Sequence, residues 1–196
     1  MMKNSITSYE RGVESKQSPQ SKDALIRGLL LRLRRIAMTA VILGSFFFSL
    51  SVSAQTIPIL TFDSFEKYLK PTSDTVFVIN FWATWCKPCV EELPYFEKLN
   101  ENYKTKKVKV LLVNIDFRSQ YEMKVKPFVQ KNKLKSEVIF LDMQGDNGII
   151  DKVNPAWQGT IPATTIIHAS SQTKKFFEKQ FTYEELENII KPLIKM

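Results

Sequence analysis

The segment from residue 76 to residue 115 predicts a strand, a helix and a second strand in direct succession. Val76 to Trp82 (VFVINFW) is β-branched or aromatic with one polar position, which is typical of a strand buried on both faces. Val108 to Ile115 (VKVLLVNI) is a second such run, and apolar residues recur at helical spacing from Pro88 to Tyr103. This order predicts a βαβ unit, and therefore a right-handed crossover between two parallel strands.

The rest of the C-terminal part completes an α/β pattern. A short helix over Phe65 to Leu69, capped by Asp63, is expected ahead of the βαβ unit, and the region after Gly145 is rich in turn residues. The remaining predicted elements are a helix over Tyr121 to Lys133 interrupted by Pro127, a strand over Val138 to Leu141, a hairpin of Thr164 to His168 with Lys174 to Glu178, and a last helix whose capping box pairs Thr182 with Glu185.

The first 54 residues do not follow this pattern. Residues 1–26 are expected to be an unstructured leader, because apolar spacing is almost absent there. Residues 27–54 carry four arginines and then an uncharged apolar run, which is the layout of an export signal. Small residues up to Ala54 fit cleavage after that position, but the run is nearly long enough to be an uncleaved membrane anchor. Either alternative places residues 55–196 in the periplasm or at the outer face of the inner membrane.

The net charge of +8 is concentrated in the N-terminal segment. Residues 1–54 contain eight Lys or Arg and three Asp or Glu, which leaves 20 basic against 17 acidic residues in the remainder. The C-terminal domain is thus only mildly basic. Composition therefore gives no reason to expect a nucleic acid partner, and it restricts membrane contact to the N-terminal segment.

Cys86 and Cys89, the only two cysteines of the chain, stand where the first predicted strand passes into the predicted helix. A thiolate is the reactive form of cysteine, and the N–H groups at the start of a helix lower the pKa of a nearby thiol. Two intervening residues place the second sulfur one helical turn away, within reach of a disulfide. Pro88 suits the first turn, where its missing N–H would have had no partner.

A zinc site and a purely structural disulfide both account less well for this spacing. A closed zinc site needs four ligands, and the chain offers no further cysteine and one histidine, His168. A structural disulfide across so short a loop would stabilise the fold by at most about 2 kcal/mol. Thiol–disulfide exchange is therefore the favoured chemistry of the pair.

The segment FWATWCKPC, Phe81 to Cys89, resembles the active-site segment of thioredoxin-fold proteins, in particular the exported TlpA/ResA-like thiol-disulfide oxidoreductases. The segment TIPAT, Thr160 to Thr164, is similar to the cis-proline loop of the same proteins. The resemblance covers about residues 57–196. It implies a thioredoxin-like α/β fold, with a central mixed β-sheet flanked by helices.

Residue by residue, the resemblance makes Cys86 the attacking cysteine and Cys89 the resolving one, with Trp85, Lys87 and Pro88 as their supporting neighbours. Two more supporting residues would come from the second motif. They are Ile161, whose backbone would bind a substrate peptide by β-augmentation, and Pro162, which would follow a cis bond.

Two polar residues near the cysteines, Asn80 and Glu92, bear on proton transfer. Asn80 stands where cytoplasmic thioredoxins have a buried aspartate, and ResA-like members tend to have an acidic residue at the position of Glu92. Glu92 lies one helical turn after Cys89, so its carboxylate can relay the proton that Cys89 must lose. The alternative is that Glu92 is a surface residue favoured by the helix dipole, although neighbouring Glu91 could be the exposed one of the two.

The resemblance implies a reductant for disulfides of exported proteins, for example in cytochrome c maturation. Such a protein needs no prosthetic group beyond its own dithiol, and it takes electrons from a membrane donor. Lys87 beside the Cys86 thiolate favours oxidant behaviour and the two glutamates oppose it, so a disulfide-forming oxidant stays an alternative. Two further alternatives are a copper-binding assembly factor that uses His168, and a binding module without redox activity.

Overall fold

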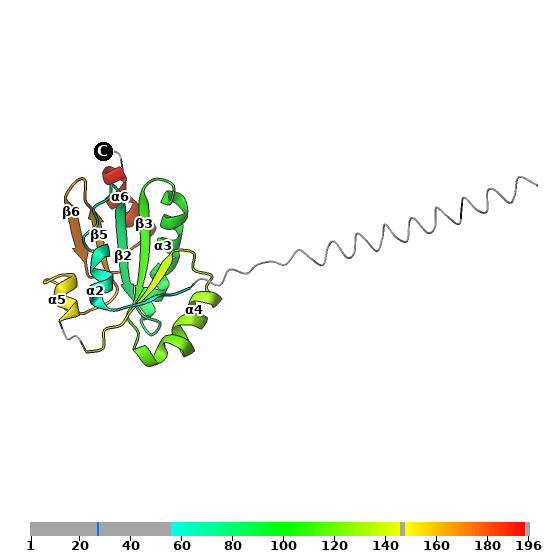
Figure 1. Cartoon of the computed structure of the whole chain (residues 1–196). Helices are drawn as coiled ribbons and strands as arrows, with labels where there is room; N and C mark the ends of the chain where they lie inside the picture. The colour runs from blue at the N-terminus through cyan, green and yellow to red at the C-terminus, as the bar shows by residue number, and fades with distance from the viewer. Residues whose placement is uncertain (1–26, 28–55, 146–147, 195–196) are drawn as a thin grey trace, which may run out of the picture. The chain divides into compact units, whose positions relative to one another are not determined.

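The computed structural model describes residues 27, 56–145 and 148–194 (Figure 1). The expected leader, residues 1–26, lies outside the described residues. The same holds for the expected signal or anchor over residues 27–54, apart from Arg27, and for the expected cleavage after Ala54. Among the helices in the described part of the chain, none has both the length and the apolar character needed to cross a membrane.

Six strands form a single mixed sheet in the order β1-β4-β3-β2-β5-β6. Figure 1 labels β3, β2, β5 and β6, which follow one another across the sheet. The strands are β1 (Ile59–Leu60), β2 (Val76–Trp82), β3 (Val108–Asn114), β4 (Glu137–Leu141), β5 (Ala163–His168) and β6 (Thr173–Phe177). Strands β1, β4, β3 and β2 are parallel, whereas β5 is antiparallel to β2 and β6 is antiparallel to β5. The βαβ unit and the hairpin predicted from the sequence are both present.

Helices cover both faces of the sheet. They are α2 (Phe62–Phe65), α3 (Lys87–Tyr103), α4 (Lys126–Lys131), α5 (Ile149–Val153) and α6 (Tyr183–Ile194), with 3₁₀ turns η1 (Glu66–Tyr68) and η2 (Arg118–Gln120) and a π-helical turn η3 (Tyr121–Val125). Buried side chains of α3, α4 and α6 share one core, while those of α2 and α5 share the other. The sheet therefore lies between two helical layers.

Strand β2 explains why its sequence is apolar almost throughout. Val78 and Trp82 point into the core shared with α3 and α6, whereas Ile79 and Phe81 point into the core shared with α2 and α5. Successive side chains of a strand alternate between faces, so a central strand covered on both sides must be apolar at every position. Asn80 is the buried exception.

One local expectation was wrong, and two short elements were not predicted. The first helix begins at Phe62 after Thr61 as its N-cap, not after Asp63, because Phe62 and Phe65 are both buried one turn apart. The turn-rich region contains α5, a helix of five residues that is too short to show a clear apolar period. Strand β1 has two residues and gave no recognisable pattern.

The helix expected over residues 121–133 is divided into η3 and α4. Pro127 has no N–H to continue the helical ladder, and its ring would crowd the preceding turn. The chain widens there, and the Lys126 N–H donates to the Tyr121 carbonyl five residues earlier, the π-helical spacing. The position of the interruption was therefore predicted, but its π-helical form was not.

Candidate active site at the Cys86–Cys89 disulfide

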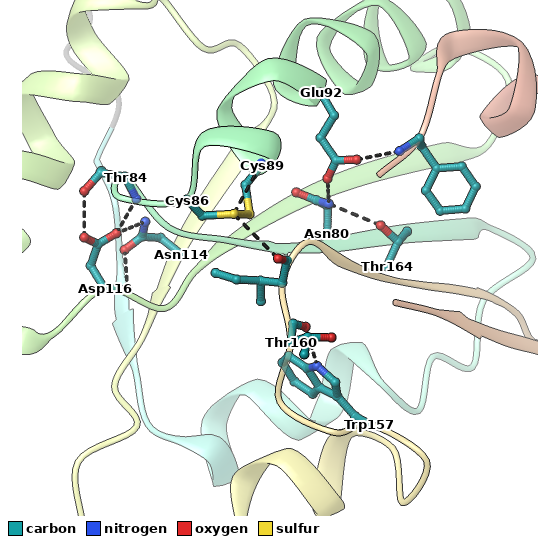
Figure 2. The surroundings of a disulfide bond; sticks show 12 residues. Asn80, Thr84, Cys86, Cys89, Glu92, Asn114, Asp116, Trp157, Thr160 and Thr164 are labelled. Carbon is teal, nitrogen blue, oxygen red and sulfur yellow. Dashed lines mark hydrogen bonds between the residues drawn. A yellow bond between two sulfur atoms is a disulfide. The ribbon is translucent and has the colours of Figure 1, made fainter. Parts of the chain in front are cut away.

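Cys86 is the N-cap of α3, at the end of the short connection from β2 (Figure 2). Its backbone is extended, with φ −87° and ψ 99°, and its Sγ accepts a hydrogen bond from the Cys89 N–H at 3.3 Å. Pro88 occupies the first turn of the helix. The free N–H groups and the helix dipole at this end stabilise negative charge on Sγ, as expected from the sequence.

The two cysteines are joined by a disulfide, with their Cα atoms 5.3 Å apart. Cys86 is 6% exposed, whereas Cys89 is completely buried. Cys86 is thus the only one of the two that retains exposed surface. This difference favours Cys86 as the attacking residue and Cys89 as the resolving one.

The loop before β5 meets the disulfide because of the strand register. Strand β5 is antiparallel to β2 with Ala163 opposite Phe81, so the residues that precede β5 lie beside those that follow β2. The Ile161–Pro162 peptide bond is cis, as the resemblance implies. The Ile161 carbonyl oxygen lies 3.7 Å from Cys86 Sγ, and Figure 2 draws this contact from Cys86.

Two side chains that do not belong to the sequence motifs hold this loop. Trp157 is buried against Phe81, with 4.8 Å between ring centroids, and its Nε1–H donates to the Thr160 carbonyl at 2.8 Å (Figure 2). Glu178 Oε1 accepts from the backbone N–H groups of Gln158 and Thr160 and from the Thr160 hydroxyl. The Thr160 hydroxyl is the main cause that lowers the pKa of Glu178, so this carboxylate stays charged.

A second network fixes the connection between β2 and Cys86. The Asp116 carboxylate accepts from the Thr84 N–H and from the Thr84 hydroxyl, both at 2.7 Å, and from Asn114 Nδ2 at 2.8 Å (Figure 2). Asp116 is 4% exposed. Sequence patterns did not reveal this pair because Thr84 and Asp116 belong to different strand–loop junctions, and only the parallel pairing of β2 with β3 brings them together.

Glu92 lies inside the protein, on the α3 turn that follows Cys89. Its side chain is fully buried, and Oε1 accepts from Asn80 Nδ2 while Oε2 accepts from the Phe181 N–H, both at 2.7 Å. Figure 2 shows Glu92 and Asn80 pointing toward each other, with Thr164 as a further acceptor for the Asn80 amide at 3.2 Å. The alternative of a surface glutamate at position 92 is therefore wrong.

Burial raises the pKa of Glu92 from the usual 4.5 to about 7, because a charged carboxylate loses its water. The two hydrogen bonds oppose this effect without cancelling it. Both donors are uncharged, and a cation would have been needed to keep the group fully ionised. Glu92 is consequently a carboxyl group that exchanges its proton near neutral pH.

The supporting residues Lys87 and Trp85 face solvent. Lys87 is exposed, and its Nζ lies 3.7 Å from Glu91 Oε1 in an ion pair along the helix. Glu91 thus offsets the positive charge that was expected to act on Cys86. Of the two neighbouring glutamates, Glu91 is the exposed one and Glu92 is buried. Trp85 is 60% exposed immediately before the first cysteine, so its ring is available to a bound molecule.

His168 lies far from the cysteines. It pairs with Val76 at the opposite end of β2, five positions along β5 from Ala163, which is about 17 Å at the usual rise of a strand. Its ring contacts Ser171 Oγ at 2.8 Å and Asp74 Oδ1 at 3.1 Å. A copper site made from the cysteines and His168 is excluded by this separation.

No group of three His, Cys, Asp or Glu side chains suited to a metal ion is found in residues 56–145 and 148–194.

Comparison with known proteins finds a matching family model and several similar proteins. The Redoxin family model matches residues 66–186. A thiol-disulfide oxidoreductase ResA from Geobacillus kaustophilus is 32% identical over 110 residues, which are 56% of this chain and 58% of that protein. A ResA from Bacillus thuringiensis subsp. konkukian is 31% identical over 115 residues, 59% of this chain and 61% of the relative. This chain therefore spans less than two thirds of the length of these relatives.

Solved structures agree on the fold. A thiol:disulfide interchange protein of the thioredoxin family from Chlorobium tepidum superposes with a TM-score of 0.52 at 18% identity, covering 62% of this chain and 81% of the other. A secreted thiol-disulfide isomerase from Corynebacterium glutamicum gives a TM-score of 0.54 at 20% identity, covering 65% and 75%. At these identities the likeness concerns the fold, which is thioredoxin-like as expected from the sequence.

Proposed function

This chain belongs to the Redoxin family, and we propose that it is a thiol-disulfide oxidoreductase that reduces disulfide bonds of exported proteins. The observation that carries this proposal is the position of Cys86 Sγ, at the N-terminus of α3 and 3.7 Å from the Ile161 carbonyl, above a buried Cys89. A sulfur placed in this way is activated, belongs to the more exposed of the two cysteines and lies next to a loop whose backbone can bind a peptide.

The reaction transfers two electrons from the dithiol to the client. The Cys86 thiolate attacks one sulfur of the client disulfide, that S–S bond breaks, and the released client thiolate takes up a proton. Cys89 then loses its proton and attacks Cys86 Sγ. The mixed disulfide breaks, the second client sulfur leaves as a thiol, and the Cys86–Cys89 disulfide is the oxidised product.

We assign the proton of Cys89 to the Glu92 carboxylate. The two side chains are one turn apart on α3 and both are fully buried, so water is not the ready acceptor for this proton. A group with a pKa of about 7 is partly ionised at neutral pH and can both take up the proton and give it away again.

The client would bind along the cis-proline loop. Ile161 lies two residues before β5 begins, and an extended peptide can pair with its backbone as an added strand. Trp157, Thr160 and Glu178 hold this loop, so its backbone groups are oriented before the client arrives.

The cellular setting is part of the proposal. Residues 1–26 would be a leader and residues 27–54 an export signal or anchor, with residues 55–196 acting in the periplasm or at the outer face of the inner membrane. Apocytochrome c is a client class that the resemblance suggests. The dithiol serves as the redox group without another cofactor, and a membrane protein returns electrons to it.

The reduction potential of the Cys86–Cys89 pair tests the direction of electron flow. We expect a value near that of thioredoxin, about −270 mV, and a value near −120 mV would instead indicate an oxidant. Trapping of free thiols in cells is an independent check. A reductant keeps a substantial fraction of the pair reduced, and a fully oxidised pair contradicts the proposal.

A further inference from the structure

A hollow of about 300 Å³ opens between the connection that leads into Cys86 and the helical segment η3–α4. Its lining residues are Thr84, Trp85, Lys124, Pro127, Phe128 and Lys131. Thr84 and Trp85 immediately precede Cys86 in the chain, so a polypeptide whose cysteine has reached Cys86 can place a neighbouring residue in this hollow. None of the sequence motifs assigns a role to it.

Aromatic and proline side chains form the apolar part of the hollow. Phe128 packs against Trp82, with ring centroids 5.2 Å apart, and this contact ties α4 to the end of β2. Trp85 presents a ring that is 60% exposed. The π-helical turn η3 ends two residues before Pro127, and such turns occur often at functional sites.

Two lysines make the charge of the hollow positive. Lys124 and Lys131 are exposed, and within the described ranges no carboxylate comes within ion-pair distance, 4.0 Å, of either ammonium group. Neighbouring cations of the same segment differ in this respect. Lys126 pairs with Glu122 at 2.9 Å, and Arg118 pairs with Asp142 at 3.7 Å.

The nearby acidic groups are already engaged. Asp116, which contacts Thr84, accepts hydrogen bonds from three donor atoms and is buried. Glu91 lies in an ion pair with Lys87. The two free ammonium groups are therefore the charges that an incoming molecule meets at this wall, and an anionic group complements them.

We propose that this hollow is a specificity subsite for an aspartate or glutamate side chain of the client polypeptide, close in sequence to the cysteine that Cys86 attacks. The carboxylate would lie between Lys124 and Lys131, with its methylene groups against Trp85 and Pro127. The inference rests on the proposed function, and it adds a substrate class: clients with an acidic residue beside the disulfide.

The test compares three disulfide peptides that differ in one residue next to the cysteine, which is Asp, Asn or Lys. The reduced full-length protein reacts with each, and the second-order rate constant is measured at low salt and at 0.5 M NaCl. Two exposed charges should favour the Asp peptide over the Lys peptide by about tenfold at low salt, and screening should reduce this ratio toward one. The neutral compound 2-hydroxyethyl disulfide gives the basal rate.

Variants identify the charges responsible. The double variant Lys124→Glu with Lys131→Glu should reverse the preference, whereas Lys124→Arg with Lys131→Arg should keep it. Lys175→Glu, an exposed change on β6, is the matched control and should leave the ratio unchanged. An unchanged preference in the double glutamate variant overturns the subsite. Failure to reduce any of the peptides or 2-hydroxyethyl disulfide overturns the proposed function itself, and the subsite with it.

Discussion

A carboxyl group lies near each end of strand β2, in contact with partners from distant segments. The pKa is raised at one end and lowered at the other. At the carboxyl end, Glu92 is buried with uncharged donors, and its pKa rises to about 7. At the amino end, Asp74 accepts from Lys107, Ser170 and His168, and these hydrogen bonds hold its pKa well below the usual range.

The comparison separates a reactive site from a structural one. A carboxyl group that is half ionised near neutral pH can transfer protons, whereas a carboxylate whose pKa is held well below the usual range stays ionised at neutral pH and holds its partners in place. The difference lies in whether the neighbours of the carboxylate are neutral donors in a dry core or donors that include a lysine at the surface.

The largest effect is expected from the cysteines of the carboxyl end. Cys86→Ser should lower the rate of insulin disulfide reduction by at least about 10³-fold, because the nucleophile of the first step is lost. Cys89→Ser should instead trap a mixed disulfide with the client, which mass spectrometry or a non-reducing gel detects. Equal trapping by both variants would contradict the different roles of the two sulfurs.

Next in size is the effect of Glu92 on the rate. Glu92→Gln should slow the resolving step by about 10²-fold at pH 7 and remove a titration near pH 7 from the pH–rate profile, because general acid–base catalysis contributes on this scale. Glu101→Gln, an exposed change on the same helix, is the control. A profile that keeps the titration in Glu92→Gln would show that another group moves the proton.

The stability of the folded protein should also depend on Glu92. Between pH 4.5 and about 7 the folded protein keeps a proton on Glu92 that the unfolded chain has lost, so the free energy of unfolding falls as the pH rises. The expected slope from this group is about −1.4 kcal/mol per pH unit. Urea denaturation of the wild type and of Glu92→Gln at pH 5 and pH 8 measures it. A constant difference between the two proteins would refute the raised pKa.

The smallest effect on activity is expected at the amino end. His168→Ala should lower the free energy of unfolding by about 1 to 3 kcal/mol, since it removes a buried ring with two hydrogen-bonding contacts. The rate of disulfide reduction and the reduction potential should stay at the wild-type values. A changed reduction potential in His168→Ala, or stoichiometric copper binding that depends on His168, would contradict a purely structural role for this residue.

Much of the fold was visible in the sequence because the signals are local. Strand β2, helix α3 and strand β3 follow from apolar spacing, and the hairpin β5–β6 follows from two short apolar runs around a turn. Helix α5 was not predicted because it has five residues and depends on the burial of its side chains against the sheet. The π-helical form of η3, also five residues long, was not predicted because it depends on Pro127.

Some residues of the site could be predicted from the sequence and others could not. Cys86, Cys89 and Pro162 stand out by type and motif, and the structure brings them together. The state of Glu92 was not predictable, because its burial depends on Phe181, which is 89 positions later in the chain. Thr84 and Asp116 were overlooked for the same reason, since 32 residues separate them.

The sequence by itself determined the kind of chemistry, through two cysteines at the junction of a buried strand and a helix. Tertiary structure alone decided which sulfur is accessible, which carboxyl group carries an exchangeable proton, and which two lysines lie free beside Trp85. The physical reason is that exposure, pKa and charge pairing depend on the distances between side chains, and for these residues most of the close neighbours come from distant parts of the chain.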